Sequence, residues 1–317
     1  MIISRHKLEI MSKETNFIID NLEKVLRLSA ILNYLNNDII FERKLALKGG
    51  TAINLTAVEL PRLSVDIDLD FTMNTSKEEM IETKEKFKKR LIDYMTQEEY
   101  ILEDMREYFA LNSFSFKYKN SAGNSDNIKI EINYLDRCHV LPLETKKIYT
   151  KNILDNYDIL TLNTIELYAS KINALLSRAA PRDLYDVYVM IEKNVITNTD
   201  LLKKCLLFYN VIGGNYDIQN LSFNNIESID YMKYKKRLKP VLTKNDKFNL
   251  ENAKKIVIDY IKKLVVFSPK EEEFLLKFQN KIYLPELLFD DENILDRIKN
   301  HPAIFWRLKN QNIIDNM

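Results

Sequence analysis

The sequence contains few of the residues that cross-link or bend a chain. Its 317 residues include two cysteines, five glycines, seven prolines and one tryptophan. Cys138 and Cys205 are too few for a disulfide framework and lack the paired spacing of metal ligands, so we expect both to be buried apolar residues. The three histidines are scattered, which argues against a zinc site built from histidine. Scarce glycine and proline argue against glycine-rich loop machinery and many-turned β-sandwiches.

Long apolar runs and an excess of one charge are also missing. No run of eighteen apolar residues occurs, and the first residues do not have the pattern of a signal peptide. The 47 Lys and Arg residues nearly balance the 46 Asp and Glu residues, for a formal net charge of +1. This balance excludes a uniformly basic surface but permits a confined basic cleft. We therefore expect a cytoplasmic protein with no membrane partner.

Apolar residues make up 46% of the sequence, enough for a sizeable core. The length suggests two domains. The N-terminal half mixes helical and strand patterns, whereas the C-terminal half is helical from about Asp158. A capping box is expected at Ser76 and Glu79, and a hairpin around the loop at 120–124. The patterns predict helices over 14–42, 76–95, 165–178, 182–192, 199–210, 249–266 and 270–280, helical turns over 52–60, and strands over 45–48, 65–71, 113–118 and 128–133.

Three aspartates alternate with apolar residues over 65–71. Asp66, Asp68 and Asp70 fall on one face of the expected strand. Carboxylates two residues apart lie about 6–7 Å from each other at the backbone and can converge on one divalent cation or bridge two. A hard ion such as Mg²⁺ prefers these oxygen ligands. Taken alone, the pattern is more typical of an edge strand with a solvated acidic face, because edge charges prevent association of sheets.

A strand that ends in two glycines precedes these aspartates. In Lys48-Gly49-Gly50-Thr51 the glycines allow backbone N–H groups to approach phosphate oxygens, and the threonine hydroxyl adds a donor. Alone, this sequence is typical of an ordinary turn. Together with the acidic strand, it favours a nucleotide-phosphate site.

Two blocks of the sequence carry a resemblance to a known family. The first is Lys48-Gly-Gly-Thr-Ala, with Arg62-Leu-Ser-Val-Asp66-Ile-Asp68-Leu after it; the second runs from Glu166 to Asp186. These blocks, and the ending around 301–306, resemble the AbiEii/AbiGii nucleotidyltransferase toxins, whose relatives include the MenT toxins. The long gap between the glycines and Asp66 is normal for that subfamily.

The resemblance implies an α+β fold: a polymerase-β-like nucleotidyltransferase core with a small mixed sheet, followed by a helical C-terminal domain. It places the core, with its N-terminal helix, at 1–157 and a helical domain that completes the active site at 158–317. It implies catalytic roles for Asp66, Asp68, Glu131, Lys171 and Asp183, nucleotide binding by Lys48, Gly49, Gly50, Thr51, Ser64 and Arg178, and Mg²⁺ or Mn²⁺ held by Asp66, Asp68 and Glu131. Asp70 is expected to share their face without contacting metal.

Glu131 and the second block also have simpler explanations. Glu131 shares a hairpin face with Lys129 and Asn133, as an outward polar residue would. Lys171 and Arg178 are seven residues apart on one helix, so both would reach triphosphate oxygens from nearly one face, or form a solvated stripe.

Acidic residues in the second block leave the general base undecided. Asp183 follows Pro181 in a first helical turn, where an acid complements the helix dipole. Asp186 is an i, i+4 partner of Arg182. Which of Glu131, Asp183 and Asp186 acts as base stays open.

The resemblance also implies the partners. The protein would transfer nucleotides from an NTP to an RNA 3′ end, with tRNA as the acceptor, and would be paired genetically with an antitoxin that need not bind it. Basic residues interleaved with aromatics at 231–239 suit RNA and a solvated helix face equally, whereas 84–90 fits a solvated helix face. Two other interpretations are a D-x-D glycosyltransferase that uses a nucleotide-sugar and a relative that binds nucleotide or RNA without catalysis.

Overall fold

A computed structural model describes residues 3–148, 153, 156–214 and 221–314. The ends of the two predicted domains, residues 1–2 and 315–317, lie outside the described residues. The chain forms two compact units that interleave in sequence: unit 1 is 1–137, 143–161 and 238–247, and unit 2 is 138–142, 162–237 and 248–317. The functions assigned to 1–157 and 158–317 stay a prediction.

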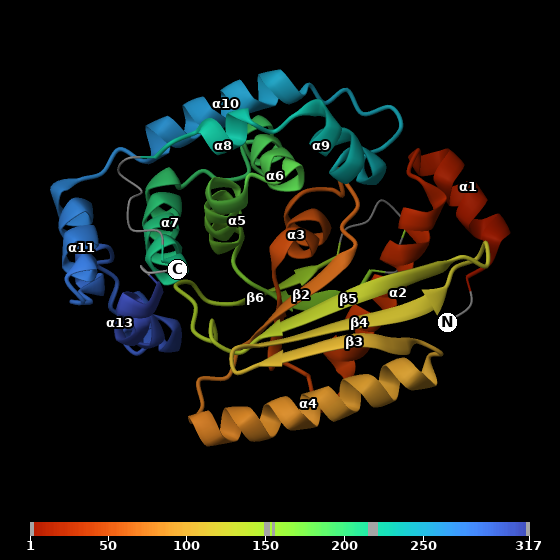
Figure 1. The fold of residues 1–317 in the computed structure, drawn as a ribbon, viewed down its shortest axis with the longest axis horizontal. Helices are drawn as coiled ribbons and strands as arrows, with labels where there is room; N and C mark the ends of the chain where they lie inside the picture. Colours follow the sequence, from red (N-terminus) through yellow and green to blue (C-terminus); the bar gives the residue numbers. More distant parts are fainter. Residues whose placement is uncertain (1–2, 149–152, 154–155, 215–220, 315–317) are drawn as a thin grey trace. The chain divides into compact units, whose positions relative to one another are not determined.

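Unit 1 is built on a mixed sheet of seven strands in the order β3-β4-β5-β2-β1-β7-β6 (Figure 1). The strands are β1 (Leu45–Leu47), β2 (Asp66–Phe71), β3 (Ile101–Tyr108), β4 (Leu111–Lys119), β5 (Ser125–Asn133), β6 (Glu144–Lys147) and β7 (Asp158–Thr161). β2 is parallel to β5, β1 is parallel to β7, and the other neighbours are antiparallel. The predicted α+β class with a mixed sheet is confirmed.

Helices cover the apolar face of this sheet. Unit 1 contains α1 (Arg5–Thr15), α2 (Ile19–Asn37), α3 (Gly49–Ala52), the π-helix η1 (Ile53–Ala57), α4 (Lys77–Gln97) and the 3₁₀ turn η3 (Lys239–Val241). The rings of Tyr34 on α2 and Tyr94 on α4 stack with centroids 3.5 Å apart. Phe87 of α4 packs edge-on against Phe71 of β2, so α4 lies against the sheet as Figure 1 shows.

Alternation along the strands separates an apolar face from a polar one. On β5, Ile128, Ile130 and Ile132 are fully buried, and on β4 so are Phe114 and Phe116. The residues between them are partly or fully exposed. The face opposite α4 is therefore polar and open, which makes it available for a site.

Several local predictions for unit 1 are confirmed. β4 and β5 form the expected antiparallel hairpin, with Ser113 opposite Glu131. The capping box at the start of α4 is present, because Glu79 N donates to Ser76 Oγ at 3.2 Å and Ser76 N donates to Glu79 Oε2 at 3.3 Å.

Other elements differ from the predictions. The helix expected over 14–42 is divided, because Asn16 adopts a left-handed φ of 61° and ends α1. Residues 158–161 form β7 rather than the start of a helical pattern. Strand β3 was not predicted, since all eight of its residues are exposed and charged side chains obscure its alternation.

Unit 2 is helical over its described residues. It comprises α5 (Thr164–Arg178), α6 (Pro181–Glu192), α7 (Thr199–Gly213), α8 (Asn224–Glu227), α9 (Tyr231–Arg237), α10 (Leu250–Leu264), α11 (Pro269–Gln279), the turn η4 (Pro285–Leu287), α12 (Glu292–Ile298) and α13 (Pro302–Ile314). α5 packs against α6 and α7, and α10 lies against α6 (Figure 1). Pro181 at the first position of α6 confirms the predicted boundary.

Candidate active site

Two of the three aspartates stand half-buried on the open face of β2. Asp66 and Asp68 alternate with the buried Ile67 and Leu69, so both carboxylates project from the polar side of the sheet. The parallel pairing of β2 with β5 places Asp68 beside Glu131. Neighbouring strands lie about 4.8 Å apart, so the register puts these three acidic residues on one face within reach of a common ligand.

Glu131 nevertheless has a partner of its own. Its Oε1 lies 2.8 Å from Lys129 Nζ, on the same strand and face. Within the described part of the chain, no group of three or more His, Cys, Asp or Glu side chains is gathered as a metal site. The predicted metal set of Asp66, Asp68 and Glu131 shares a face, but the three carboxylates do not meet in this structure.

The turn at Gly49 and Gly50 packs directly against the aspartate pair. Gly49 has a φ of +68°, and a Cβ there would lie 2.6 Å from Asp68 Oδ2. A Cβ on Gly50 would lie 2.7 Å from Arg62 Nη2. A side chain at Gly49 would therefore displace the Asp68 carboxylate, and one at Gly50 would displace the Arg62 guanidinium.

Thr51 anchors this turn to β2. Its hydroxyl donates to the carbonyl oxygen of Asp66 at 2.5 Å and lies 2.8 Å from Ser64 Oγ. Thr51 is fully buried, while Ser64 is partly exposed. The expected hydrogen bond from the Thr51 hydroxyl to phosphate would thus compete with the hydrogen bond that holds the turn. Ser64 remains accessible.

Lys48, expected to bind nucleotide, forms a tight ion pair beneath the turn. Its Nζ lies 2.5 Å from Asp70 Oδ1 and 4.0 Å from Asp136 Oδ2. Burial raises the pKa of Asp70 to about 7, although Lys48 opposes the rise. Burial lowers the pKa of Lys48, but Asp70 and Asp136 outweigh it, so the pKa is raised and the ammonium persists. Asp70 therefore differs from Asp66 and Asp68, because its side chain is buried.

The predicted residues of the second block form a buried ionic cluster inside unit 2. Lys171 of α5 lies 2.8 Å from Asp183 Oδ1 and 3.2 Å from Asp186 Oδ2, both on α6. Arg178 Nε donates to Asp183 Oδ2 at 2.7 Å. The tight connection between the helices, with Ala179 at a φ of 45°, brings these residues together.

The charges of this cluster are largely matched internally. Burial raises the pKa of Asp183, but Lys171 and Arg178 outweigh it and hold the pKa below the usual 3.8. An aspartate held ionised by two cations is a weak proton acceptor. Lys171 is itself buried, so the solvated stripe considered for it is excluded, while Arg178 remains largely exposed.

Two residues of the quoted motifs had been given no role. Arg62 is fully buried beside Gly50 and donates from Nη1 to the carbonyl oxygen of Leu63 at 2.9 Å. In unit 2, Glu166 accepts hydrogen bonds from Val140 N at 2.7 Å and Leu141 N at 3.0 Å, and burial raises its pKa to about 7. The only sign of a role for Arg62 and Glu166 in the sequence is that each is a charged residue among mainly uncharged neighbours.

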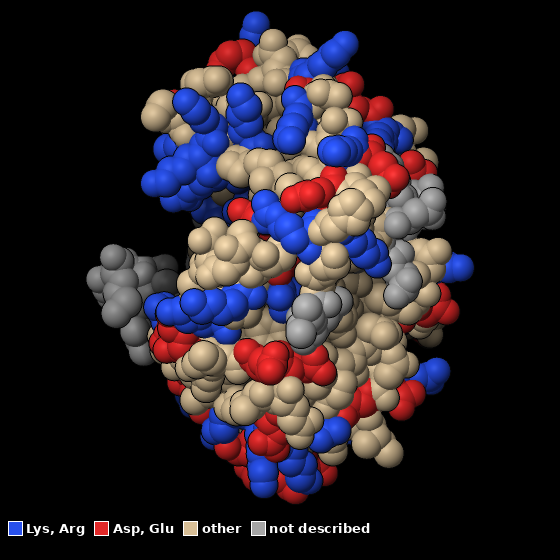
Figure 2. Space-filling view, turned by 90° about the vertical axis from the view of Figure 1, so that its right-hand side faces the viewer, with Lys and Arg blue, Asp and Glu red and all other residues tan. Residues whose placement is uncertain are grey.

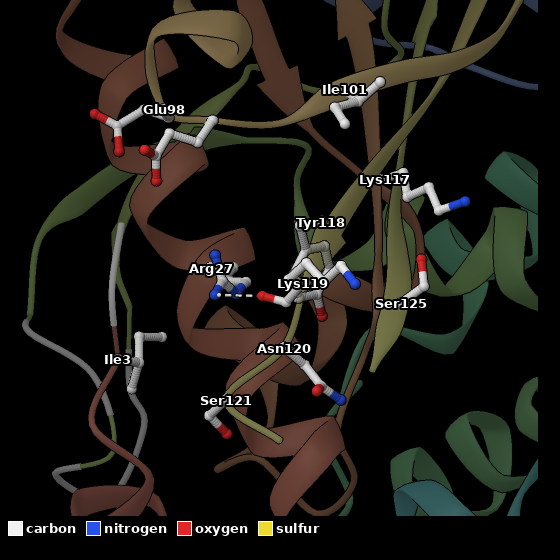
Figure 3. A pocket seen from close by; sticks show the side chains of 11 residues that line it. Ile3, Arg27, Glu98, Ile101, Lys117, Tyr118, Lys119, Asn120, Ser121 and Ser125 are labelled. Carbon is white, nitrogen blue, oxygen red and sulfur yellow. Dashed lines mark hydrogen bonds between the residues drawn. The ribbon is translucent and has the colours of Figure 1, made fainter. Parts of the chain in front are cut away.

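A separate cavity of about 380 Å³ lies in unit 1 near the hairpin loop (Figure 3). Arg27 of α2 lies against it, 4.3 Å from the ring centroid of Tyr118, and donates from Nη2 to the Lys119 carbonyl oxygen at 3.4 Å. Its Nε donates to buried Glu23 at 3.0 Å. The Arg27 charge thus stabilises the packing of α2 on the hairpin. The cavity lies at the opposite end of β4 from Ser113.

The fold is that of a nucleotidyltransferase toxin. The structure resembles MenT4, a nucleotidyltransferase toxin from Mycobacterium tuberculosis H37Rv, with a TM-score of 0.65 over 96% of this chain and 99% of that one. The two sequences are 15% identical, so this likeness concerns the fold. No curated protein matches the sequence.

The chain belongs to the AbiEii family. The family described as "Nucleotidyl transferase AbiEii toxin, Type IV TA system" matches residues 31–270, which include both quoted blocks. The protein is therefore a nucleotidyltransferase and the toxin of a type IV toxin–antitoxin system. Enzymes of this kind generally use a divalent metal. Over the described residues, no helix is long and apolar enough to cross a membrane.

Proposed function

We propose that this toxin transfers a nucleotide from an NTP to the 3′ end of an RNA, with tRNA as the acceptor and Mg²⁺ or Mn²⁺ as the metal. The single observation that carries the proposal is the aspartate pair on β2, packed against the Gly49-Gly50 turn on one side and registered with Glu131 on the other. A D-x-D glycosyltransferase would explain the aspartates but neither the turn nor the family match.

The donor chemistry of the open face suits a hard cation. Asp66 and Asp68 are half-buried carboxylates on one face, and the space above Gly49 that a Cβ would fill is occupied by Asp68 Oδ2. These two residues would hold the metal, joined by Glu131 when its carboxylate leaves Lys129. The bound ion would neutralise charge on the phosphates and on the attacking oxygen.

The residues of unit 1 would then perform the remaining steps. Backbone N–H groups of Gly49 and Gly50, with Ser64 Oγ, would bind the triphosphate. The oxygen of the RNA 3′-hydroxyl attacks the α-phosphorus, the bond from that phosphorus to the pyrophosphate oxygen breaks, and pyrophosphate departs. Glu131 would accept the hydroxyl proton, because it is registered beside Asp68 and is partly exposed.

We assign the cluster in unit 2 a supporting part in this proposal. Lys171 would hold Asp183 and Asp186 in position, because its ammonium lies between their buried carboxylates. Arg178, with most of its side chain exposed, would contact phosphate directly. The low pKa of Asp183 makes it an orienting residue rather than the general base.

Helix α9 supports RNA as the acceptor. None of its residues is buried, it ends in Lys235, Lys236 and Arg237, and the Tyr231 side chain is 59% exposed. Figure 2 shows a face of the molecule on which Lys and Arg side chains gather. Exposed cations with aromatic rings suit RNA phosphates and unstacked bases.

The cations at 86–90 lie on the solvated helix face that was expected for 84–90, but Lys84 does not. Lys86 pairs with Glu82 at 2.6 Å and Lys88 with Glu85 at 2.6 Å along α4, while Lys84 is buried. We do not place RNA there. Modification of tRNA would stop translation in the cytoplasm, in keeping with a phage-defence role, and an antitoxin could restrain such a toxin without binding it.

A direct assay tests the proposal. Purified protein is incubated with total tRNA, one α-labelled NTP at a time, and Mg²⁺, Mn²⁺ or EDTA. We expect label on the RNA 3′ end with one or more NTPs and none with EDTA. Absence of label on any RNA with every NTP would refute the transfer, and release of nucleoside diphosphate from a nucleotide-sugar would favour the glycosyltransferase.

Replacing Gly49 should lower the rate of transfer without unfolding the protein. Gly49→Ala imposes a left-handed backbone on alanine, at about 1–2 kcal/mol, and drives a methyl group into Asp68. A displacement near 1 Å at a reacting centre lowers the rate by about 100-fold. We expect this loss in the labelling assay, with the circular dichroism spectrum unchanged.

Gly123→Ala is the matched control. Gly123 has a φ of +82° and no atom within 4 Å of a Cβ, so it carries the backbone cost without the collision. Its transfer rate should equal that of the wild type. An equal loss of rate in both variants would mean that backbone strain, and not Asp68, explains the Gly49 result.

A further inference from the structure

A row of polar residues crosses four strands of the open face of unit 1. The register pairs Arg106 on β3 with Ser113 on β4, Ser113 with Glu131 on β5, and Glu131 with Asp68 on β2. Residues paired in this way point to the same side of a sheet. The row therefore runs from the edge strand to the catalytic aspartate pair.

A second row runs beside the first. Asp104 pairs with Ser115, Ser115 with Lys129, and Lys129 with Asp66, again across β3, β4, β5 and β2. Both rows consist of side chains that form hydrogen bonds. The opposite face of β2, β4 and β5 is apolar and buried, whereas all eight residues of β3 are exposed. An open sheet face that only needed solvation would not require small hydroxyl residues in the middle of both rows.

The surface over these rows is concave. A hollow of about 420 Å³ is lined by residues of both rows, together with Tyr108 and Leu111 near the β3–β4 turn and Asn127 on β5. This volume is within the range of small-molecule sites. We call the hollow the polar trough. Serines at 113 and 115 make its floor, because longer side chains there would fill it.

The charges of the trough favour a nucleoside over a phosphate. Its two cations, Arg106 and Lys129, face three carboxylates, and each cation already has an acidic neighbour. Arg106 Nε lies 3.2 Å from Asp104 Oδ2, with both side chains more than half exposed. Paired donors and acceptors of this kind read the edge of a base, whereas a phosphate site would carry net positive charge.

The strand order indicates whether this nucleoside belongs to the incoming NTP or to the RNA acceptor. The Gly49-Gly50 turn follows β1, on one side of β2, and the trough extends over β5, β4 and β3 on the other. In an in-line displacement the attacking hydroxyl and the leaving pyrophosphate lie on opposite sides of the phosphorus. With the triphosphate at the turn, the attacking group must approach from the trough.

We propose that the polar trough binds the 3′-terminal nucleotide of the RNA acceptor, with Arg106, Ser113 and Ser115 reading its base and sugar and Tyr108 stacking on it. This inference rests on the proposed function. These are specificity residues, since they would contact the acceptor two or three strands away from the aspartate pair on β2. Tyr108 suits stacking because the residue is 59% exposed and lines the trough.

Two variants test the trough, Tyr108→Ala and the double variant Arg106→Ala with Ser113→Ala. All three positions lie on the exposed face, so the variants should fold. Loss of a stacked base or of a base-edge contact weakens binding by about 10-fold or more. We expect the KM for tRNA to rise about 10-fold, with the KM for the NTP and the rate at saturating tRNA unchanged.

Lys117→Ala is the matched control, because it removes a cation from β4 on the same face but outside the trough. It should leave the KM for tRNA unchanged. An unchanged KM for tRNA in both trough variants overturns the proposal. A raised KM for the NTP also overturns it, because the trough would then hold the incoming nucleotide.

Binding without transfer keeps this test independent of the proposed function. Fluorescent tRNA is titrated without NTP, and competed with intact tRNA or with tRNA that ends in a 3′-phosphate. The wild type should prefer the intact end and the trough variants should lose that preference. If no RNA is labelled by any NTP but the wild type prefers the intact end, the proposed transfer is refuted while the proposed RNA binding by the trough is supported. If the wild type shows no preference, the proposal for the trough is overturned.

Discussion

Asp68→Asn should abolish nucleotide transfer while leaving the fold intact. The amide keeps the shape of the side chain but removes the charge that would hold the metal, an effect worth several kcal/mol in the transition state. At 1.4 kcal/mol per tenfold, we expect a loss of about 1,000-fold or more in the labelling assay. Stability should not fall, since the change relieves repulsion from Asp66 on the same face.

The control for this variant is Glu103→Gln on β3. Glu103 is about half exposed and pairs with Lys117 at 3.6 Å, so its neutralisation also removes one carboxylate from the same sheet. We expect Glu103→Gln to transfer nucleotide at the wild-type rate. Label that persists in Asp68→Asn would remove Asp68 from the metal site, and a large drop in its thermal midpoint would indicate a structural role for the carboxylate.

Lys171→Met should cause the largest loss of stability. Lys171 lies between two buried carboxylates, and its removal would leave Asp183 with only Arg178 and remove the Lys171 contact of Asp186. Breaking a buried ion pair by deleting one partner costs about 3–5 kcal/mol. We expect the unfolding midpoint in urea to fall accordingly, and transfer to be lost even at temperatures where the variant is folded.

Lys204→Met on α7 is the comparison for this variant. Lys204 pairs with Asp200 at 3.1 Å, but the Asp200 side chain is 63% exposed, so the pair should contribute less than about 1 kcal/mol. An equally small effect in Lys171→Met would show that water reaches the cluster. Full stability with lost transfer would assign Lys171 to the reaction alone.

The pH dependence provides a second measurement. The pKa of Asp183 is lower in the folded protein than its usual 3.8, so its contribution to stability is present above pH 3.8 and lost as the pH falls through the folded value. In Lys171→Met the main cation is gone and burial favours protonation. Acid unfolding of that variant should therefore begin at a higher pH than in the wild type.

The local patterns of the sequence predicted the elements on which the proposed site residues lie. The alternation at 65–71 predicted β2, because a period of two exposes every second residue on one face. Pro181 predicted the start of α6, since proline at the first helical position loses no hydrogen bond. Both signals depend only on neighbouring residues, and so they can be read without the fold.

The elements that were not predicted depend on distant contacts. β3 has no buried residue, so its strand form comes from pairing with β4 and not from its own apolar pattern. β7 contains four residues, all of which pair with β6, and Thr161 also pairs with Leu47 of β1. A propensity-based prediction has no access to either partner.

For the site, the sequence alone indicated the residues to which we assign the chemistry, namely the aspartate pair, the glycine turn and Lys171, Arg178 and Asp183 of the second block, and with them the family. The tertiary structure decided their relations. The register of β2 with β5 places Glu131 beside Asp68, the packing of α5 on α6 gives Lys171 two carboxylates, and four strands in register form the polar trough. The physical reason is that chemistry resides in side chains, which the sequence states, whereas distances between strands and helices arise only when the whole core packs.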